Sequence, residues 1–232
     1  MIPDGVTTMG MSAFDACSGL TNVTMGEGLK SISGMAFRTC PLLAQMTIPD
    51  GVTNVGIYAF EGCTGLTNVA FGKGVVSIGD VAFAGCSGLL SARLPDSLTT
   101  MGYRVFKDYS RLASATVGHE VGAIDQETFM GCVGLRKVTL GQSITNIGNA
   151  AFDDCPGLTE VTFLGDAPSA SPTVFSSSND LTVYFVPGTK GWGETFGGRP
   201  TSPVSPSTAT RIQMSMATGR GVMVLGVVDG GN

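Results

Sequence analysis

The chain has 232 residues, of which 43% are hydrophobic and 13% are charged. This apolar content excludes a disordered chain, and the longest apolar run, Gly221 to Val228, is too short to cross a membrane as a helix. The net charge of −5 argues against a nucleic-acid-binding protein, which needs a basic surface. The sequence does not start with a basic segment followed by an apolar stretch, so no secretory signal is visible in it.

The sequence repeats with a period of 23 residues. Phenylalanine, cysteine and leucine each recur in one column of the repeat, and Tyr109 occupies the cysteine column in one unit. Self-similarity at a fixed period is typical of stacked architectures, in which each unit buries its apolar positions against its neighbours. The sequence therefore predicts a repeat solenoid whose register is unbroken from Ile2 to Val186. Its two structural ladders are predicted to consist of Phe14, Phe37, Phe60, Phe83, Phe106, Phe129, Phe152 and Phe175, and of Cys17, Cys40, Cys63, Cys86, Cys132 and Cys155.

Within a unit, the expected elements follow one order. Leu20 to Met25 (LTNVTM) predicts a short strand, since its apolar residues suit an inward face and the residues between them are polar. Pro49 to Gly51 predicts a turn, because proline fixes φ and glycine permits positive φ. Residues 52–56 predict a second extended stretch, and Ala59 to Cys63 predicts a short helical turn that packs its Phe and Cys inward. Stacking of the first strands predicts one parallel sheet with about 4.8 Å between rungs.

The unit from Ile48 to Phe71 (IPDGVTNVGIYAFEGCTGLTNVAF) resembles the BspA-like, or treponemal-type, leucine-rich repeat. The shared pattern is an Ile-Pro turn, a Val-x-x-Ile-Gly step, Ala-Phe-x-x-Cys and Leu-x-x-Val, and it extends over about four-fifths of the chain. The resemblance implies a leucine-rich-repeat-like right-handed coil of eight 23-residue units, with one parallel β-sheet face and short helical turns opposite. It also implies a cell-surface or extracellular protein associated with adhesion.

Composition divides the chain into four segments. The repeats are expected to end before an aromatic-rich closing segment, and a stretch rich in Pro, Ser and Thr then indicates an extended linker. Because the first repeat starts in mid-unit, we expect the chain to be part of a longer array whose first coil exposes an apolar edge, which favours end-to-end self-association. The residues expected to cover the last coil are Tyr184, Phe185, Trp192 and Phe196. The predicted boundaries are 1–186 for the solenoid, 187–200 for the C-terminal cap, 201–220 for the linker and 221–232 for the start of a truncated further element.

The cysteine column predicts a buried thiol ladder beside the phenylalanines, because free cysteine is among the most buried residue types. A disulfide between neighbouring coils stays open as an alternative, since the rung spacing lies within the allowed Cα range. Cysteines in file cannot surround one ion, which makes a metal site the weakest alternative. His119 is the single histidine and occupies a variable turn position, so we interpret it as a solvated residue rather than part of a nucleophilic triad. No enzymatic activity, cofactor or metal is predicted.

The exposed strand face is the expected binding surface, as it is in repeat proteins generally. Its outward positions are mostly small and rich in threonine, and this pattern changes around two arginines and a lysine in the middle units. The leading hypothesis is a non-enzymatic binding module for a protein or a glycan, with no nucleic-acid partner and no insertion into membranes. The candidate contact residues are Arg93, Arg136, Lys137, Thr116 and Thr139.

Two other function classes stay open. A structural spacer, or stalk, for a flanking domain is favoured by the tail rich in Pro, Ser and Thr. An ice-binding surface needs threonine in regular register on a flat face, and the threonine columns are interrupted at Ala70, Arg93 and Arg136. If the residues at outward strand positions differ between repeats without gathering in one place, the sequence indicates a spacer rather than a binding module.

Overall fold

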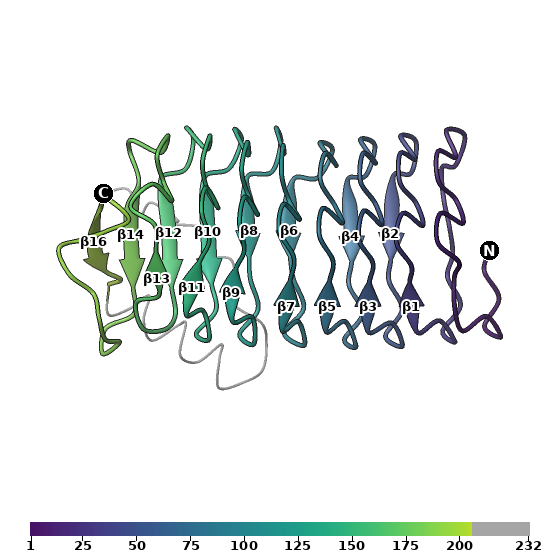
Figure 1. The fold of residues 1–232 in the computed structure, drawn as a ribbon, viewed down its shortest axis with the longest axis horizontal. Helices are drawn as coiled ribbons and strands as arrows, with labels where there is room; N and C mark the ends of the chain where they lie inside the picture. Colours follow the sequence, from purple (N-terminus) through teal and green to yellow (C-terminus); the bar gives the residue numbers. More distant parts are fainter. Residues whose placement is uncertain (206–232) are drawn as a thin grey trace, which may run out of the picture.

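The computed structural model describes residues 1–205, which wind into an elongated solenoid of stacked coils (Figure 1). Each coil contributes one strand to a broad face, one strand to a narrow face and a sharp turn that carries the phenylalanine. The narrow face consists of β1 (Ser31–Ile32), β3 (Asn54–Val55), β5 (Ser77–Ile78), β7 (Thr100–Met101), β9 (Ala123–Ile124), β11 (Asn146–Ile147) and β13 (Ser169–Ala170). The broad face consists of β2 (Gln45–Thr47), β4 (Asn68–Ala70), β6 (Ser91–Arg93), β8 (Ser114–Thr116), β10 (Lys137–Leu140), β12 (Glu160–Phe163), β14 (Thr182–Phe185) and β16 (Arg199–Pro203), with β15 (Thr195–Phe196) beside β16.

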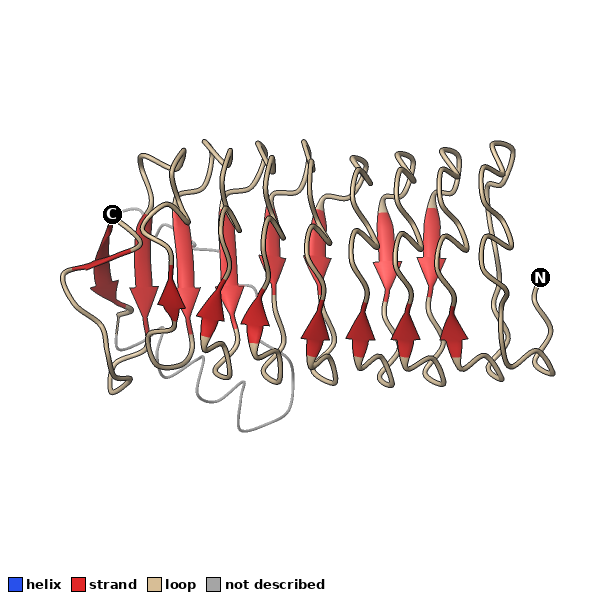
Figure 2. Cartoon of the chain, viewed as in Figure 1, coloured by secondary structure: helices blue, strands red, loops and turns tan. Residues whose placement is uncertain are grey.

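Both faces consist of parallel strands, most of which pair in register with the strand of the next coil (Figure 2). β15, which pairs with β16, is antiparallel. The pairs on the broad face include Thr116 with Thr139, and those on the narrow face include Asn54 with Ser77. The solenoid predicted from the repeat is confirmed. The prediction of one sheet face is incomplete, because the second extended stretch of each unit also pairs with its neighbours and so satisfies its backbone groups.

The predicted helical turns are wrong, since residues 1–205 contain no helix. In the segment around Phe37, Met35 and Thr39 have left-handed backbone angles, with φ of 57° and 51°. The Phe37 N–H donates to the carbonyl of Ala59 in the next coil at 2.8 Å. An α-helix needs right-handed angles throughout and hydrogen bonds four residues back along the chain. The turn therefore forms a third ladder between coils, in which alternate N–H groups point to the next coil.

This turn requires a left-handed residue at the position of Thr39, where other coils carry Gly62, Gly85 and Gly131. A non-glycine residue in the left-handed region costs roughly 1–2 kcal/mol. Glycine avoids this cost, but its own larger entropy loss on folding cancels part of the gain. Thr39 is exposed, so its side chain contributes little burial. We predict that Thr39→Gly raises the free energy of unfolding by about 1 kcal/mol in urea titrations. Thr39→Ala keeps the Cβ and serves as the control; an equal gain in both variants would contradict this explanation.

The core is a continuous stack of phenylalanine rings, one for each coil. Successive rings from Phe14 to Phe175 have centroids 5.0–6.0 Å apart. Except in the first coil, these side chains are fully buried. Contacts of this kind stabilise a solenoid only through nearest neighbours, because no coil touches one further away.

The cysteines lie beside this stack and are free thiols. The Cys63 thiol donates to the Phe37 carbonyl at 3.0 Å, and Cys86 and Cys132 make the same contact one coil back along the solenoid. The Cys40 thiol donates likewise to the Phe14 carbonyl at 3.1 Å, and burial raises the pKa of this thiol to about 11, so the proton that makes this bond is retained at neutral pH. In the unit without cysteine, the Tyr109 hydroxyl donates to the Phe83 carbonyl at 2.6 Å. The column therefore supplies a buried hydrogen-bond donor, whether a thiol or a hydroxyl.

The narrow sheet is interrupted between β7 and β9. At the end of β7, Gly102 donates its N–H to the Ile78 carbonyl at 2.9 Å, and a Cβ on Gly102 would lie only 2.6 Å from the backbone nitrogen of Asp80. Asp125 occupies this glycine column in the next coil. The Cβ of Asp125 has no room at such a distance from the preceding coil. The coil that contains β9 is therefore held away from β7, and the ladder of the narrow sheet ends there.

We predict that Asp125→Gly joins β7 to β9. The amide at position 125 then donates to the Met101 carbonyl, as Gly102 and Gly148 donate in their own coils. Hydrogen exchange followed by NMR should slow at this amide by at least about tenfold, the effect of roughly one net hydrogen bond. Asp125→Ala retains a Cβ and should leave the exchange rate unchanged. Equal slowing in both variants would show that the carboxylate, and not the Cβ, opens the sheet.

The last coil is covered by an aromatic cluster. The Trp192 ring lies 4.9 Å from Phe163 and 5.2 Å from Phe185, with Phe196 packed beside it at 5.3 Å. Arg199 donates to the carbonyl of Phe175 at 2.8 Å, at the place where a thiol from a further coil would otherwise donate. The aromatic cluster thereby covers the apolar end of the solenoid, and Arg199 satisfies the Phe175 carbonyl in the last turn.

The register slips by one residue in this last coil. Val161 pairs with Val183 and Thr162 with Tyr184, so the interval is 22 residues and the predicted unbroken register is wrong there. Tyr184 consequently lies in the outward row and does not join the aromatic cluster expected of it. β16 continues to Pro203, three residues beyond the predicted cap boundary, and pairs in parallel with β14. The remainder of the predicted linker and the element at 221–232 lie outside the described residues.

Candidate partner-contact surface

Three of the predicted contact residues form one row on the broad face. Arg93, Thr116 and Thr139 are direct register partners on β6, β8 and β10. Arg93 is exposed, and both threonines are partly exposed. The other two candidates lie apart from this row, Lys137 at the start of β10 and Arg136 immediately before it.

The three cations do not form one cluster. Lys137 forms an ion pair with Glu160 on the neighbouring strand, with Nζ and Oε2 separated by 2.9 Å, so its charge is largely neutralised. Arg136 is exposed, and its guanidinium lies over Gly157, where a Cβ would overlap Nη1. Arg93 is two strands away from Lys137 and has no ion-pair partner among residues 1–205. The row of Arg93 is therefore the more available part of the predicted surface.

Beside Arg93 the broad sheet is divided, because β4 and β6 are not hydrogen-bonded to each other. Figure 1 shows these two strands farther apart than their neighbours. Gly72, which follows β4, lies so close to the preceding coil that a Cβ there would be 2.7 Å from the backbone nitrogen of Asp50. Pro95 occupies the same column one coil later and carries a ring, so it cannot approach Gly72 in that way.

The broad sheet is also interrupted before the coil that contains Pro49. Pro49 stands in the same column as Pro95, and the strand of its coil, β2, pairs only with the following β4. Toward the preceding coil, Ala44 makes a single long hydrogen bond of 3.4 Å to the Thr21 carbonyl. Each proline therefore starts a new section of the broad sheet.

The division leaves a groove of about 690 Å³ on the broad face. It is lined on one side by residues 68–71 and Lys73, and on the other by residues 93–97. The inward side chains Val69 and Phe71 are only half-buried there, whereas their counterparts Met46 and Ile48 in the preceding coil are 1% exposed. The groove thus opens the apolar interior to solvent. Our sequence interpretation missed it, although the replacement of glycine by Pro95 was the available signal.

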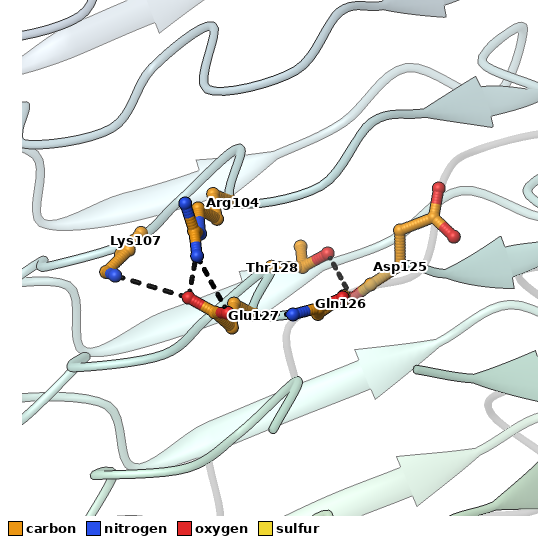
Figure 3. Close-up of polar contacts among 6 residues, drawn as sticks. All are labelled: Arg104, Lys107, Asp125, Gln126, Glu127 and Thr128. Carbon is orange, nitrogen blue, oxygen red and sulfur yellow. Dashed lines mark hydrogen bonds and ion pairs between the residues drawn. The ribbon is translucent and has the colours of Figure 1, made fainter. Parts of the chain in front are cut away.

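A second charged site lies on the turn side of the solenoid (Figure 3). Glu127 accepts hydrogen bonds from the Arg104 guanidinium at 2.7 and 2.9 Å, from Lys107 at 3.2 Å and from Gln126 at 2.9 Å. These donors, Arg104 above all, lower the pKa of Glu127 to about 2. Asp125 is not hydrogen-bonded to Glu127 in the described chain, but its backbone carbonyl accepts a hydrogen bond from the Thr128 hydroxyl at 2.8 Å. Burial, and then the charge of Asp80, raise the pKa of the Asp125 carboxyl. The network ties adjacent coils together, and the sequence analysis did not anticipate it.

We predict that Glu127→Gln lowers the free energy of unfolding at pH 7 by about 1–2 kcal/mol, a value reduced for the partial exposure of Arg104. The folded-state pKa of Glu127 is depressed, so its contribution is complete above the unfolded value of about 4.3. As pH falls from there toward 2, the carboxylate protonates and the difference between wild type and variant should vanish. Urea titrations at several pH values measure this, and a difference independent of pH would contradict it.

The candidates for chemistry in the described part of the chain are a metal-binding group of side chains and His119. Among residues 1–205, no group of three or more His, Cys, Asp and Glu side chains is arranged to hold a metal ion. His119 is partly buried rather than fully solvated, and its Nδ1 is enclosed without a hydrogen-bond partner in that part of the chain. What the broad face does provide is the groove beside Arg93 and, within residues 1–205, exposed arginines without an ion-pair partner at positions 93 and 136.

Comparison with solved structures finds similarity to bacterial leucine-rich repeat proteins, and the fold is shared with the one from T. pallidum. The leucine-rich repeat protein of T. pallidum is 27% identical, with a TM-score of 0.62 over 68% of this chain and 75% of that one. A leucine-rich cell surface protein of Faecalibacterium prausnitzii is 19% identical, with a TM-score of 0.46 over 89% of this chain and 79% of that one. No curated protein matches the chain.

The sequence profile of the BspA type leucine rich repeat region matches residues 1–113 and 53–182, in six copies. Proteins with these repeats are typically interaction modules at cell surfaces and are generally not enzymes. No helix within residues 1–205 is long and apolar enough to span a membrane. Since the matched repeats account for most of its length, the chain belongs to the BspA-type leucine-rich repeat family.

Proposed function

We propose that this chain is a non-enzymatic binding module that acts at the cell surface or outside the cell and holds a partner on its broad face. The observation that carries the proposal is the change of that face in its middle coils. There the repeated small polar surface gives way to Arg93, the adjacent groove and the exposed Arg136. A partner that contacts these coils meets features that the rest of the rod does not repeat.

A protein partner is favoured over a glycan. The groove lies between β4 and β6, which are not hydrogen-bonded to each other, so it is bordered by two strand edges. Strand edges are matched best by another polypeptide backbone. Family membership supports the same choice, because these repeats are typically protein-interaction modules.

The spacer alternative predicts that no part of the face matters more than another. The ice-binding alternative needs an uninterrupted threonine row, and the row of Thr116 and Thr139 contains Arg93 at one end and Tyr184 at the other. Both alternatives therefore make predictions that differ from the binding module.

The test uses the full chain as bait against extracellular-matrix proteins and host-cell surface extract, with retained proteins identified by mass spectrometry. Arg93→Glu/Arg136→Glu/Lys137→Glu should reduce recovery of a specific partner by at least about tenfold, because charge reversal at a contact surface opposes association. Lys30→Glu/Lys190→Glu, which reverses two exposed cations elsewhere, is the matched control. A partner lost equally from both variants, or no partner retained by the wild type, would overturn the proposal in favour of the spacer.

A further inference from the structure

The groove between β4 and β6 combines three features that point to one kind of ligand. It has two open strand edges, half-exposed apolar side chains and cations without ion-pair partners in the described chain. We propose that it binds an extended acidic peptide segment of a partner protein, which adds as a β-strand to these edges. The inference rests on the proposed protein-binding function and specifies the form of the partner.

The open edges are defined by hydrogen bonds that neighbouring coils make and this pair does not. The Ile48 N–H donates to the Ala70 carbonyl at 2.8 Å, and Leu94 donates to Thr116 at 3.1 Å. Phe71 stands between them in the same column, and its N–H has no partner among residues 1–205.

The opposite edge shows the same loss. The Thr67 N–H donates to Ala44, and Ala113 donates to Leu90, each at 2.9 Å. The Leu90 N–H itself has no partner within the described residues. Unpaired backbone donors on a strand edge are the groups that an added strand satisfies. A peptide in the groove would therefore supply the ladder that Pro95 prevents.

The floor of the groove accepts apolar side chains. Val69 and Phe71 are half-buried, and the Phe71 ring packs edge-to-face on Phe83 with centroids 5.6 Å apart. Because alternate residues of a strand point to opposite sides, every second side chain of an added peptide would face these residues. The others would face the solvent-exposed rim.

The rim selects for acidic side chains. Lys73 lies on one side of the groove and Arg93 on the other, both exposed, and no carboxylate pairs with either among residues 1–205. Asp96 is the one acidic residue on the lining and leaves a net positive rim. A peptide that alternates apolar and acidic residues fits both the floor and the rim.

The direct test uses a fluorescein-labelled peptide of four Val-Glu repeats, with a C-terminal amide, and the full chain. Fluorescence anisotropy should show saturable binding of this peptide. Two control peptides should bind at least about tenfold more weakly: one of Val-Lys repeats, and a Val-Glu peptide N-methylated at alternate residues. N-methylation removes hydrogen bonds to the strand edges, each worth about 1 kcal/mol. Binding should also slow hydrogen exchange at the Phe71 and Leu90 amides. Absence of binding, equal affinity for the three peptides, or binding without protection at these two amides would overturn the inference.

A variant that closes the groove gives an independent test. Pro95→Gly/Ser97→Gly gives this coil the two glycines that its predecessor has at Gly72 and Gly74, so the strands can pair. We expect protected Phe71 and Leu90 amides in the free variant and a loss of Val-Glu peptide affinity of at least about tenfold. Pro49→Gly, at the proline that stands in this column two coils earlier, is the matched control and should bind as wild type does. Undiminished affinity in a variant with these amides protected would contradict the inference.

The two proposals can fail separately. If Arg93→Glu/Arg136→Glu/Lys137→Glu loses a partner protein while the Val-Glu peptide never binds the wild type, the binding module stands and the strand-addition inference fails. If the peptide binds as expected but no partner protein is recovered from any surface extract, the proposed surface function fails and the groove remains a peptide site.

Discussion

The solenoid depends on how closely the backbones of successive coils approach one another. Three ladders of hydrogen bonds join the coils, on the two strand faces and at the phenylalanine turn. At several columns this approach leaves no space for a Cβ, and glycine is therefore required. The ladders are interrupted at Asp125 and at Pro95, each of which stands in a column where neighbouring coils carry such a glycine. β13, by contrast, still pairs with β11 beside Ser171, so the residue that replaces glycine matters as well.

Buried polar groups are satisfied by donors that belong to the repeat itself. From Phe14 to Phe129, the carbonyl of each phenylalanine in the turns accepts a hydrogen bond from a thiol or, at Phe83, from the Tyr109 hydroxyl of a following coil. At the end of the array Arg199 takes over this task for Phe175. An unmet buried carbonyl would cost about 1–3 kcal/mol, which explains why the column accepts several residue types but requires a donor. The cysteines need no redox or metal role to account for their regularity.

Much of the fold could be predicted from the sequence, because a strict period and a few apolar columns are visible without coordinates. The helical turn was wrong since Ala-Phe-x-x-Cys spacing places Phe and Cys on one side of either a helix or a turn with two left-handed residues. The slip before Thr182 was missed because the leucine and phenylalanine columns continue in phase. The groove arises from one ring at Pro95, whose effect depends on the distance to Gly72. The Glu127 network likewise needs the neighbouring coil to be placed before its donors converge.

The interrupted ladder on the broad face is the central claim, since both the fold account and the binding proposals depend on it. Hydrogen exchange of the free full chain, read at single amides by NMR, tests it most directly. The account predicts that Phe71 and Leu90 exchange at least about tenfold faster than Ile48 and Thr67, their hydrogen-bonded counterparts one coil earlier. Equal protection at all four amides would show that β4 and β6 are joined in solution, and that Pro95 does not open the sheet.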